Sequence, residues 1–229
     1  MVIPLYDRDP TQFKVPPYVT WSLIALNVVV FLVEQATGGG EFLMMSYGAV
    51  PAAILGHVPN ASPIPAWATL VTSMFLHNGW LHVGGNMLYL FVFGDDIEEA
   101  MGWWRFLLFY MASGILAGLA YVATNADNVG PMVGASGAIA GVLAAYLMLR
   151  PCAKLWVLVL FRPVKIAAMW AIGLWVAFQF YDIAQGEDDG VAYAAHLGGL
   201  AAGAALFVAL RPRDVELFEC LYEKEATLP

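Results

Sequence analysis

Four polar side chains stand out in this sequence because they lie in stretches that are otherwise apolar enough to enter a bilayer. Ser136 lies in the sequence GASG, His196 begins HLGG, and His82 and Asn86 are the two ends of HVGGN. Polar groups are costly in hydrocarbon, so each one at membrane depth is a candidate for function. A serine hydroxyl becomes a nucleophile when an imidazole accepts its proton, and neutral N–H groups stabilise the oxyanion of an acyl-transfer reaction.

Six apolar stretches are long enough to position these side chains in a bilayer. The chain has 229 residues, of which 61% are hydrophobic and 12% charged, unlike the composition of a soluble domain. A transmembrane helix needs about 20 mostly apolar residues. The predicted spans are Tyr18–Gln35, Trp80–Gly94, Trp103–Thr124, Met132–Leu149, Ile166–Ala184 and Ala192–Leu210. We therefore predict an all-α, polytopic membrane protein whose core is a bundle of six transmembrane helices.

The basic residues predict the orientation of this bundle. Cytoplasmic loops of membrane proteins are enriched in lysine and arginine. All ten basic residues fall on one side of the six predicted spans: Arg8, Lys14, Arg105, Arg150, Lys154, Arg162, Lys165, Arg211, Arg213 and Lys224. Both termini are therefore expected in the cytoplasm, and the three loops without basic residues are expected outside.

The predicted spans divide the chain into three parts. Residues 1–17 form a polar N-terminal segment, residues 18–210 the membrane domain, and residues 211–229 a C-terminal tail too short for a second core. The long first loop, residues 37–78, contains four prolines. Loops of this length rarely lack structure, so we expect a partly helical element at the outer interface rather than a disordered linker. The side chains expected to face lipid are Phe42, Leu43, Met44, Trp67 and Leu70.

Charge and motif content exclude several classes of protein. A net charge of −8 gives no basic surface for nucleic acid. The sequence lacks the CxxC and HExxH spacings of metal sites, a P-loop and a GxGxxG loop, so no metal or other cofactor is expected. Cys152 and Cys220 both fall on the predicted cytoplasmic side, where we expect free thiols rather than a disulfide.

The four polar side chains are predicted to lie at one depth. His82 and Asn86 are four residues apart, which places both on one face of a helix. They lie near the outer end of the second span, Ser136 near that of the fourth and His196 near that of the sixth. At about 1.5 Å rise per residue, all four sit roughly 5–12 Å below the outer surface.

Small residues near the serine and the histidine predict a close contact between two helices. They are Gly134, Gly137 and Gly141 around Ser136, and Gly199 and Gly203 after His196. Small residues spaced by four let transmembrane helices approach closely. Packing of the fourth span on the sixth would bring Ser136 within hydrogen-bond reach of His196, as nucleophile and general base. His82, Asn86 and the Ser136 backbone N–H would form the oxyanion hole, and no acidic third member is evident at that depth.

Each of these residues taken alone also has a structural explanation. A lone serine in a membrane helix usually bonds the carbonyl four residues earlier. A lone intramembrane histidine is more often a hydrogen-bonding link or a proton relay than a catalytic base. His77, in FLHNGWLH, either tethers the first loop or supports the oxyanion hole. The functional interpretation rests on the conjunction, in which three spans bring a hydroxyl, an imidazole and a His/Asn pair to one level.

Three stretches of the chain resemble the rhomboid family of intramembrane serine proteases: LVTSMFLHNGWLHVGGNMLYLFVFG (residues 70–94), GASGAIAG (134–141) and AHLGGLAAG (195–203). Each motif alone is loose, but HxxxN, GxSG and AHxxG in this order are specific. The resemblance implies a six-helix bundle that cleaves transmembrane segments of single-pass membrane proteins. Ser136 would be the nucleophile and His196 the general base, with His82 and Asn86 lining the oxyanion hole. It also implies that the fifth span and the loop 185–191 gate substrate access.

Two positions depart from the family pattern. Many members carry Trp-Arg in the first loop, where this chain has AWATL (residues 66–70) without arginine. Many bacterial members place a tyrosine four residues after the nucleophile, where it stacks on the catalytic histidine. Here Ala140 occupies that position, so either another ring supports His196 or the pair is looser. Neither change removes a group that performs the chemistry, so activity is still expected.

The resemblance and the composition together predict where the protein works. We expect a multi-pass protein of a bacterial inner membrane, whose site opens to the extracytoplasmic side. One alternative is a catalytically silent relative that binds membrane helices as an adaptor or chaperone, which would be expected to lack the serine or the histidine. Another is a proton or small-solute channel, which would need polar groups across the whole membrane rather than in the outer leaflet alone.

Overall fold

The computed structural model describes residues 3–7, 16–159, 162–185 and 190–220. The helices are α1 (Tyr18–Thr37), α2 (Gly40–Tyr47), α3 (Pro51–Ile54), α4 (Thr69–Thr72), α5 (Trp80–Met101), α6 (Trp103–Thr124), α7 (Ser136–Leu149), α8 (Ala168–Gln185) and α9 (Tyr193–Leu210). Two 3₁₀ turns, η1 (Ala66–Ala68) and η2 (Ser73–Phe75), flank α4. The strands are β1 (Ile3–Asp7), β2 (Lys154–Val159) and β3 (Arg162–Ala167). The chain is therefore mostly helical, as predicted.

The six long helices α1, α5, α6, α7, α8 and α9 coincide with the six apolar stretches of the sequence. Within the described residues, α1, α6 and α9 are each long and apolar enough to cross a membrane. The other three differ from the predicted spans at their ends. Helix α5 continues to Met101 through four acidic residues, α7 begins at Ser136, and α8 begins at Ala168.

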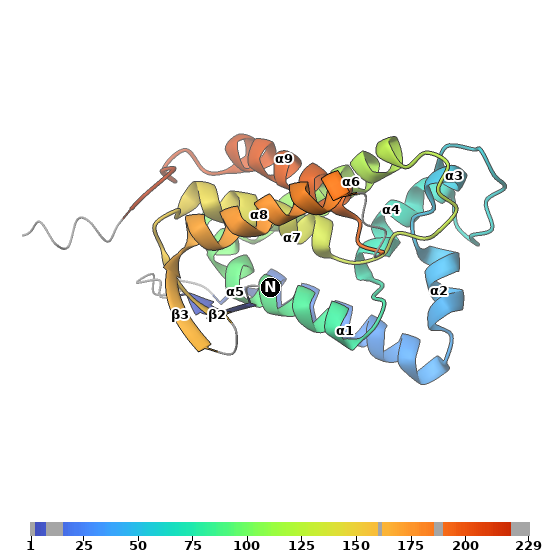
Figure 1. Cartoon of the computed structure of the whole chain (residues 1–229), viewed down its shortest axis with the longest axis horizontal. Helices are drawn as coiled ribbons and strands as arrows, with labels where there is room; N and C mark the ends of the chain where they lie inside the picture. Colours follow the sequence, from blue (N-terminus) through green and yellow to red (C-terminus); the bar gives the residue numbers. More distant parts are fainter. Residues whose placement is uncertain (1–2, 8–15, 160–161, 186–189, 221–229) are drawn as a thin grey trace, which may run out of the picture.

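Helix α7 lies at the centre of the bundle. Eleven of its 14 residues are buried, on every side of the helix, as expected of a helix that is apolar all round. Helices α5, α6 and α9 pack around it, and α1 lies along α5 (Figure 1). The site residues therefore sit on this central helix, which carries Ser136, and on two helices packed against it, α5 and α9.

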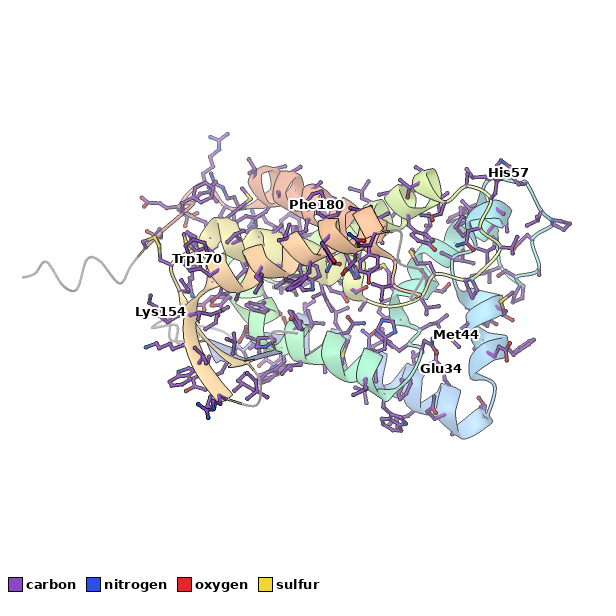
Figure 2. All side chains as sticks on the ribbon, viewed as in Figure 1. Glu34, Met44, His57, Lys154, Trp170 and Phe180 are labelled. Carbon is purple, nitrogen blue, oxygen red and sulfur yellow. A yellow bond between two sulfur atoms is a disulfide. The ribbon has the colours of Figure 1, made fainter. Side chains whose placement is uncertain are left out.

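A three-stranded antiparallel sheet occupies the end of the molecule opposite α2 and α3 (Figure 1). Strand β2 pairs with β1 on one side and with β3 on the other, so that Lys154 lies opposite Ala167. The prediction of an all-helical chain is wrong here. In β2, Leu155 and Val157 are fully buried and alternate with less buried residues, which is the period of two of a strand. The sequence did not predict this strand because the segment is a short apolar connection between two predicted spans. In Figure 2, Lys154 and Trp170 mark this end of the molecule and His57 the other.

Cys152 and Cys220 form a disulfide, so the prediction of free thiols is wrong. Cys152 follows α7, and the described part of the C-terminal tail folds back over the end of that helix. There Phe218 N–H donates to the carbonyl of Met148 at 2.6 Å, which satisfies one of the carbonyl groups left free at a helix end. The prediction rested only on the expected cytoplasmic location, and it took no account of the tail returning to the end of α7.

The first loop is partly helical, as α2, α3, η1, α4 and η2 show. Phe42 and Trp67 are exposed, in keeping with the expected contact with lipid. Leu70 is buried, so its predicted contact with lipid is wrong. It packs under the loop against α6, because Gly118 leaves space for its side chain.

Buried acidic groups tie the helices together at the sheet end of the bundle. The carboxylate of Glu98 accepts hydrogen bonds from the N–H groups of Val19 and Thr20, which begin α1. This contact replaces the N-cap that α1 lacks. Asp96, also on α5, forms an ion pair of 2.7 Å with Arg150 at the end of α7. Helices α5 and α7 are therefore fixed to each other at the ends that lie away from His82 and Ser136.

Candidate active site

Ser136 and His196 meet where α7 and α9 begin. Ser136 is the first residue of α7, and His196 lies in the first turn of α9. Ser136 Oγ is 2.8 Å from His196 Nε2, a hydrogen-bond distance. His196 is buried and Ser136 is half-buried, so the pair lies at the edge of the packed interior.

Glycines bring the two helices this close. A Cβ on Gly199 would collide with the carbonyl oxygen of Gly137, and a Cβ on Gly203 would collide with the backbone of Gly141. Backbone therefore lies directly on backbone along the contact between α7 and α9, as small residues permit in membrane helices. Of the five glycines near Ser136 and His196 that the sequence indicated, Gly137, Gly141, Gly199 and Gly203 lie in this contact, whereas Gly134 faces His82.

His82 and Asn86 lie beside the segment that leads into α7. A Cβ on Gly134 would lie 2.7 Å from His82 Nε2 and 3.6 Å from Asn86 Nδ2. Gly134 also has φ +120°, which a side chain would strain, and its N–H donates to the carbonyl of Ser73 at 2.8 Å. The lack of space and the positive φ both require glycine at this position, and the φ, which is not helical, also prevents α7 from beginning earlier.

Two N–H donors face this segment. The backbone N–H of Asn78 donates to His82 Nδ1 at 3.3 Å, so in the neutral ring the proton is on Nε2, the atom that faces Gly134. Among the described residues, the buried Nδ2 of Asn86 has no hydrogen-bond partner. The N–H groups of the first turn of α7 lie outside the helical hydrogen-bond ladder. These groups together form a set of donors around Gly134, two residues before Ser136.

His77 lies behind His82, in the connection between η2 and α5. It is buried, and its ring packs edge-on against that of His82, with 5.0 Å between the centroids. Burial, together with the neighbouring His82, lowers the pKa of His77 to about 4, so the ring is neutral at physiological pH. His77 therefore supports His82 by packing and does not contact Ser136 or His196 through any hydrogen bond of the described structure.

Two residues of α8 contact His196, and the sequence analysis missed both. Gln179 Oε1 lies 2.5 Å from His196 Nδ1. The ring of Trp175 lies 5.6 Å from the imidazole at an interplanar angle of 38°. Because Ala140 stands where many family members have a tyrosine, Trp175 is the ring that lies beside His196 in its place. A signal was present, because Gln179 is a lone amide within an apolar span, one turn after a tryptophan.

The arrangement can carry out acyl transfer through a serine. It combines a hydroxyl, an imidazole that can accept its proton, and several N–H donors at one place. Within the part of the chain that the structure describes, no group of three His, Cys, Asp or Glu side chains could hold a metal ion.

A family model described as the Rhomboid domain matches residues 65–213. The chain is 30% identical over 169 residues to Rhomboid-type serine protease 2 of Emericella nidulans, covering 71% of this chain and 31% of that protein. It is 32% identical over 204 residues to Rhomboid protein 1, mitochondrial, of Saccharomyces cerevisiae, covering 85% and 55%. It is 32% identical over 133 residues to Rhomboid protease GluP of Bacillus subtilis, covering 57% and 24%.

The chain thus spans from about a quarter to about half of the length of these curated relatives. The matched domain nevertheless includes more than half of this chain and all of the helices that carry the serine, the histidines and the asparagine. Together with its apolar helices, this match shows that the chain is an integral membrane protein that belongs to the rhomboid family.

Proposed function

We propose that this protein is an intramembrane serine endopeptidase that hydrolyses peptide bonds in or near transmembrane segments of other membrane proteins. The observation that carries the proposal is the 2.8 Å contact between Ser136 Oγ and His196 Nε2, at the beginning of two glycine-packed helices. As the first residue of α7, Ser136 has no carbonyl four residues earlier within its own helix, and its hydroxyl instead contacts His196. Membership of the rhomboid family, with relatives named as proteases, supports the same activity.

The proposed topology has six spans with both termini in the cytoplasm. Six long helices match the six apolar stretches, and the ten basic residues fall on one side of them. Helix α7 has 14 residues and is therefore about 21 Å long, shorter than a hydrocarbon core of about 30 Å. With Arg150 at the cytoplasmic surface, Ser136 lies several ångströms below the outer surface, where water can reach it.

The proposed mechanism uses a covalent intermediate. His196 accepts the hydroxyl proton while Ser136 Oγ attacks the carbonyl carbon, and the carbonyl oxygen becomes an oxyanion. His82, Asn86 and the Ser136 N–H stabilise this oxyanion. The C–N bond then breaks, and His196 returns the proton to the leaving amine. Water, deprotonated by His196, attacks the acyl-serine ester and releases a carboxylic acid and the free hydroxyl.

The substrates that fit this site are single-pass transmembrane proteins. The backbone of a membrane helix is hydrogen-bonded internally, so it must unwind before its carbonyl reaches Ser136. Segments with glycine or proline are therefore the expected substrates, and the close approach of Gly134 and Gly137 favours a small residue at the cut. The proposed location is a bacterial inner membrane, with the site open to the outside. One relative is from the bacterium Bacillus subtilis, whereas the yeast relative is named as mitochondrial.

The proposal is tested by labelling the detergent-solubilised protein with a fluorophosphonate, which reacts with activated serines. We expect labelling of the wild type and none of Ser136→Ala. Ser113→Ala is the matched control, because Ser113 is a buried serine on α6 that lies beside Gly141 rather than beside His196. It should be labelled like the wild type. A folded wild type that is not labelled would contradict the proposal and favour a silent membrane-helix adaptor.

A further inference from the structure

We propose that Gln179 is a positioning residue for His196, which fixes the tautomer and orientation of the imidazole while Ser136 and His196 carry out the chemistry. This inference rests on the proposed function, because it assigns a part in the same reaction. Gln179 Oε1 lies 2.5 Å from His196 Nδ1, while Nε2 of the same ring faces Ser136. Gln179 is 5% exposed, so bulk water has little access to this hydrogen bond.

Two contacts decide which end of the Gln179 amide faces the imidazole. The amide nitrogen donates to the carbonyl of Trp175 at 3.3 Å, and a carbonyl can only accept. The amide oxygen is therefore the end at His196. Because this oxygen also can only accept, the proton of the neutral ring must be on Nδ1. Nε2 is then free to accept the hydrogen bond of the Ser136 hydroxyl, so Gln179 selects the tautomer that a general base needs.

The plane of the imidazole is also held from α8. Trp175 and Gln179 are four residues apart and project from the same face of that helix. The tryptophan ring lies beside the imidazole, tilted by 38° with 5.6 Å between the centroids, and Tyr193 lies nearly perpendicular to it from α9 at 6.4 Å. Two side chains of one helix therefore set both the tautomer and the position of the ring, and they do so only while α8 lies against α9.

An amide suits this place because it accepts a hydrogen bond without a buried charge. A buried carboxylate is costly unless it is paired. Among papain-like proteases an asparagine orients the histidine in the same way, so an amide is sufficient as a third member. The sequence showed no acidic third member because the third member is neutral and comes from a helix whose position the sequence does not fix.

The test compares two replacements of Gln179 in the full-length protein, with a fluorophosphonate as the probe. Gln179→Met keeps the length of the side chain but has no acceptor, whereas Gln179→Glu keeps an acceptor at the same position. We expect Gln179→Met to lower the maximal labelling rate roughly 10- to 100-fold, with the half-saturating probe concentration unchanged. Gln179→Glu should keep most of the rate. A packing role predicts the reverse order, because methionine fills the space and a buried carboxylate does not fit it.

Gln185→Met is the matched control, since Gln185 ends the same helix and is exposed. It should be labelled at the wild-type rate. Unfolding midpoints in detergent identify variants that fail to fold; if Gln179→Met is one, Gln179→Asn takes its place, because its shorter amide cannot reach Nδ1. A folded Gln179→Met or Gln179→Asn labelled at the wild-type rate overturns the inference and leaves the protease intact. A wild type that is not labelled contradicts the proposed function, and the inference with it.

Discussion

The two helices that hold His196 in place, α7 and α8, do so in different ways. Helix α7 buries 11 of its 14 residues and meets α9 through glycine backbones. Helix α8 buries four of its 18 residues. Its outer face carries large apolar side chains, of which Trp170 and Phe180 are labelled in Figure 2 and are 70% and 59% exposed. It reaches the histidine through the side chains of Trp175 and Gln179.

This difference separates two requirements of the site. The distance between nucleophile and base is set by backbone packing, which tolerates almost no change because protein interiors are close-packed. The orientation of the base is set by side chains of a helix with few buried contacts, the kind of element that opens at low free-energy cost. The spacing of α7 and α9 can therefore stay fixed while a movement of α8 changes the orientation of the base.

The largest expected effect on the labelling rate comes from removing an oxyanion donor on α5, which packs against α7. Asn86→Ala should lower the maximal rate of fluorophosphonate labelling about 10²- to 10³-fold, because the transition state loses a preorganised donor. The control is Asn27→Ala, which removes a buried amide that bonds its own helix at Leu23. If both variants lose the same amount of activity, Asn86 has no special role in the site.

The next largest effect is expected from a substitution in the contact between α7 and α9. Gly199→Ala places a Cβ against the carbonyl oxygen of Gly137, so the helices must separate. A shift of about 1 Å in reacting groups can cost about 10²-fold in rate, and overpacking costs about 1–3 kcal/mol of stability. Labelling rate and the thermal unfolding midpoint in detergent should therefore both fall. A variant that keeps both would show that this contact does not set the distance between Ser136 and His196.

Gly134→Ala should have a smaller effect, confined to the oxyanion side of the site. Its Cβ would press on His82 Nε2, and a non-glycine residue at φ +120° is strained by about 1–2 kcal/mol. We expect the labelling rate to fall about 10-fold, which is about 1.4 kcal/mol. Gly84→Ala, on the open side of α5, is the matched control and should behave like the wild type. Equal rates for Gly134→Ala and the wild type would argue against the oxyanion role of His82.

The smallest effect on stability is expected from a substitution on the exposed side of α8. Gly173 has no atom within 4 Å of the position that a Cβ would take. Gly173→Ala should change the free energy of unfolding by less than about 1 kcal/mol, and in the stabilising direction, because alanine favours the helix. The unfolding midpoint in detergent measures this. A loss of stability as large as that of Gly199→Ala would remove the contrast between the two helices.

Several features were predictable because they depend on local pattern. The bounds of α6 were predicted to the residue, and the starts of α1 and α5 likewise, because apolar runs bounded by polar residues define membrane helices. The end of α5 was missed because a helix can continue past the hydrocarbon through acidic residues such as Asp95 and Glu99. The start of α7 was missed because the φ of Gly134 is a property of the folded segment.

The sequence by itself determined which polar groups had to lie together. Burial of a hydroxyl, an imidazole or an amide is costly, so their spacing along apolar helices already limits where each can be. Only the tertiary structure decided what each group faces, because side-chain partners depend on how the helices are rotated and packed. The pairing of β1 with β2 and the disulfide between Cys152 and Cys220 join segments far apart in the chain, and the contact of Gln179 with His196 joins two separate helices. No local pattern records such pairings, since they arise when the helices pack.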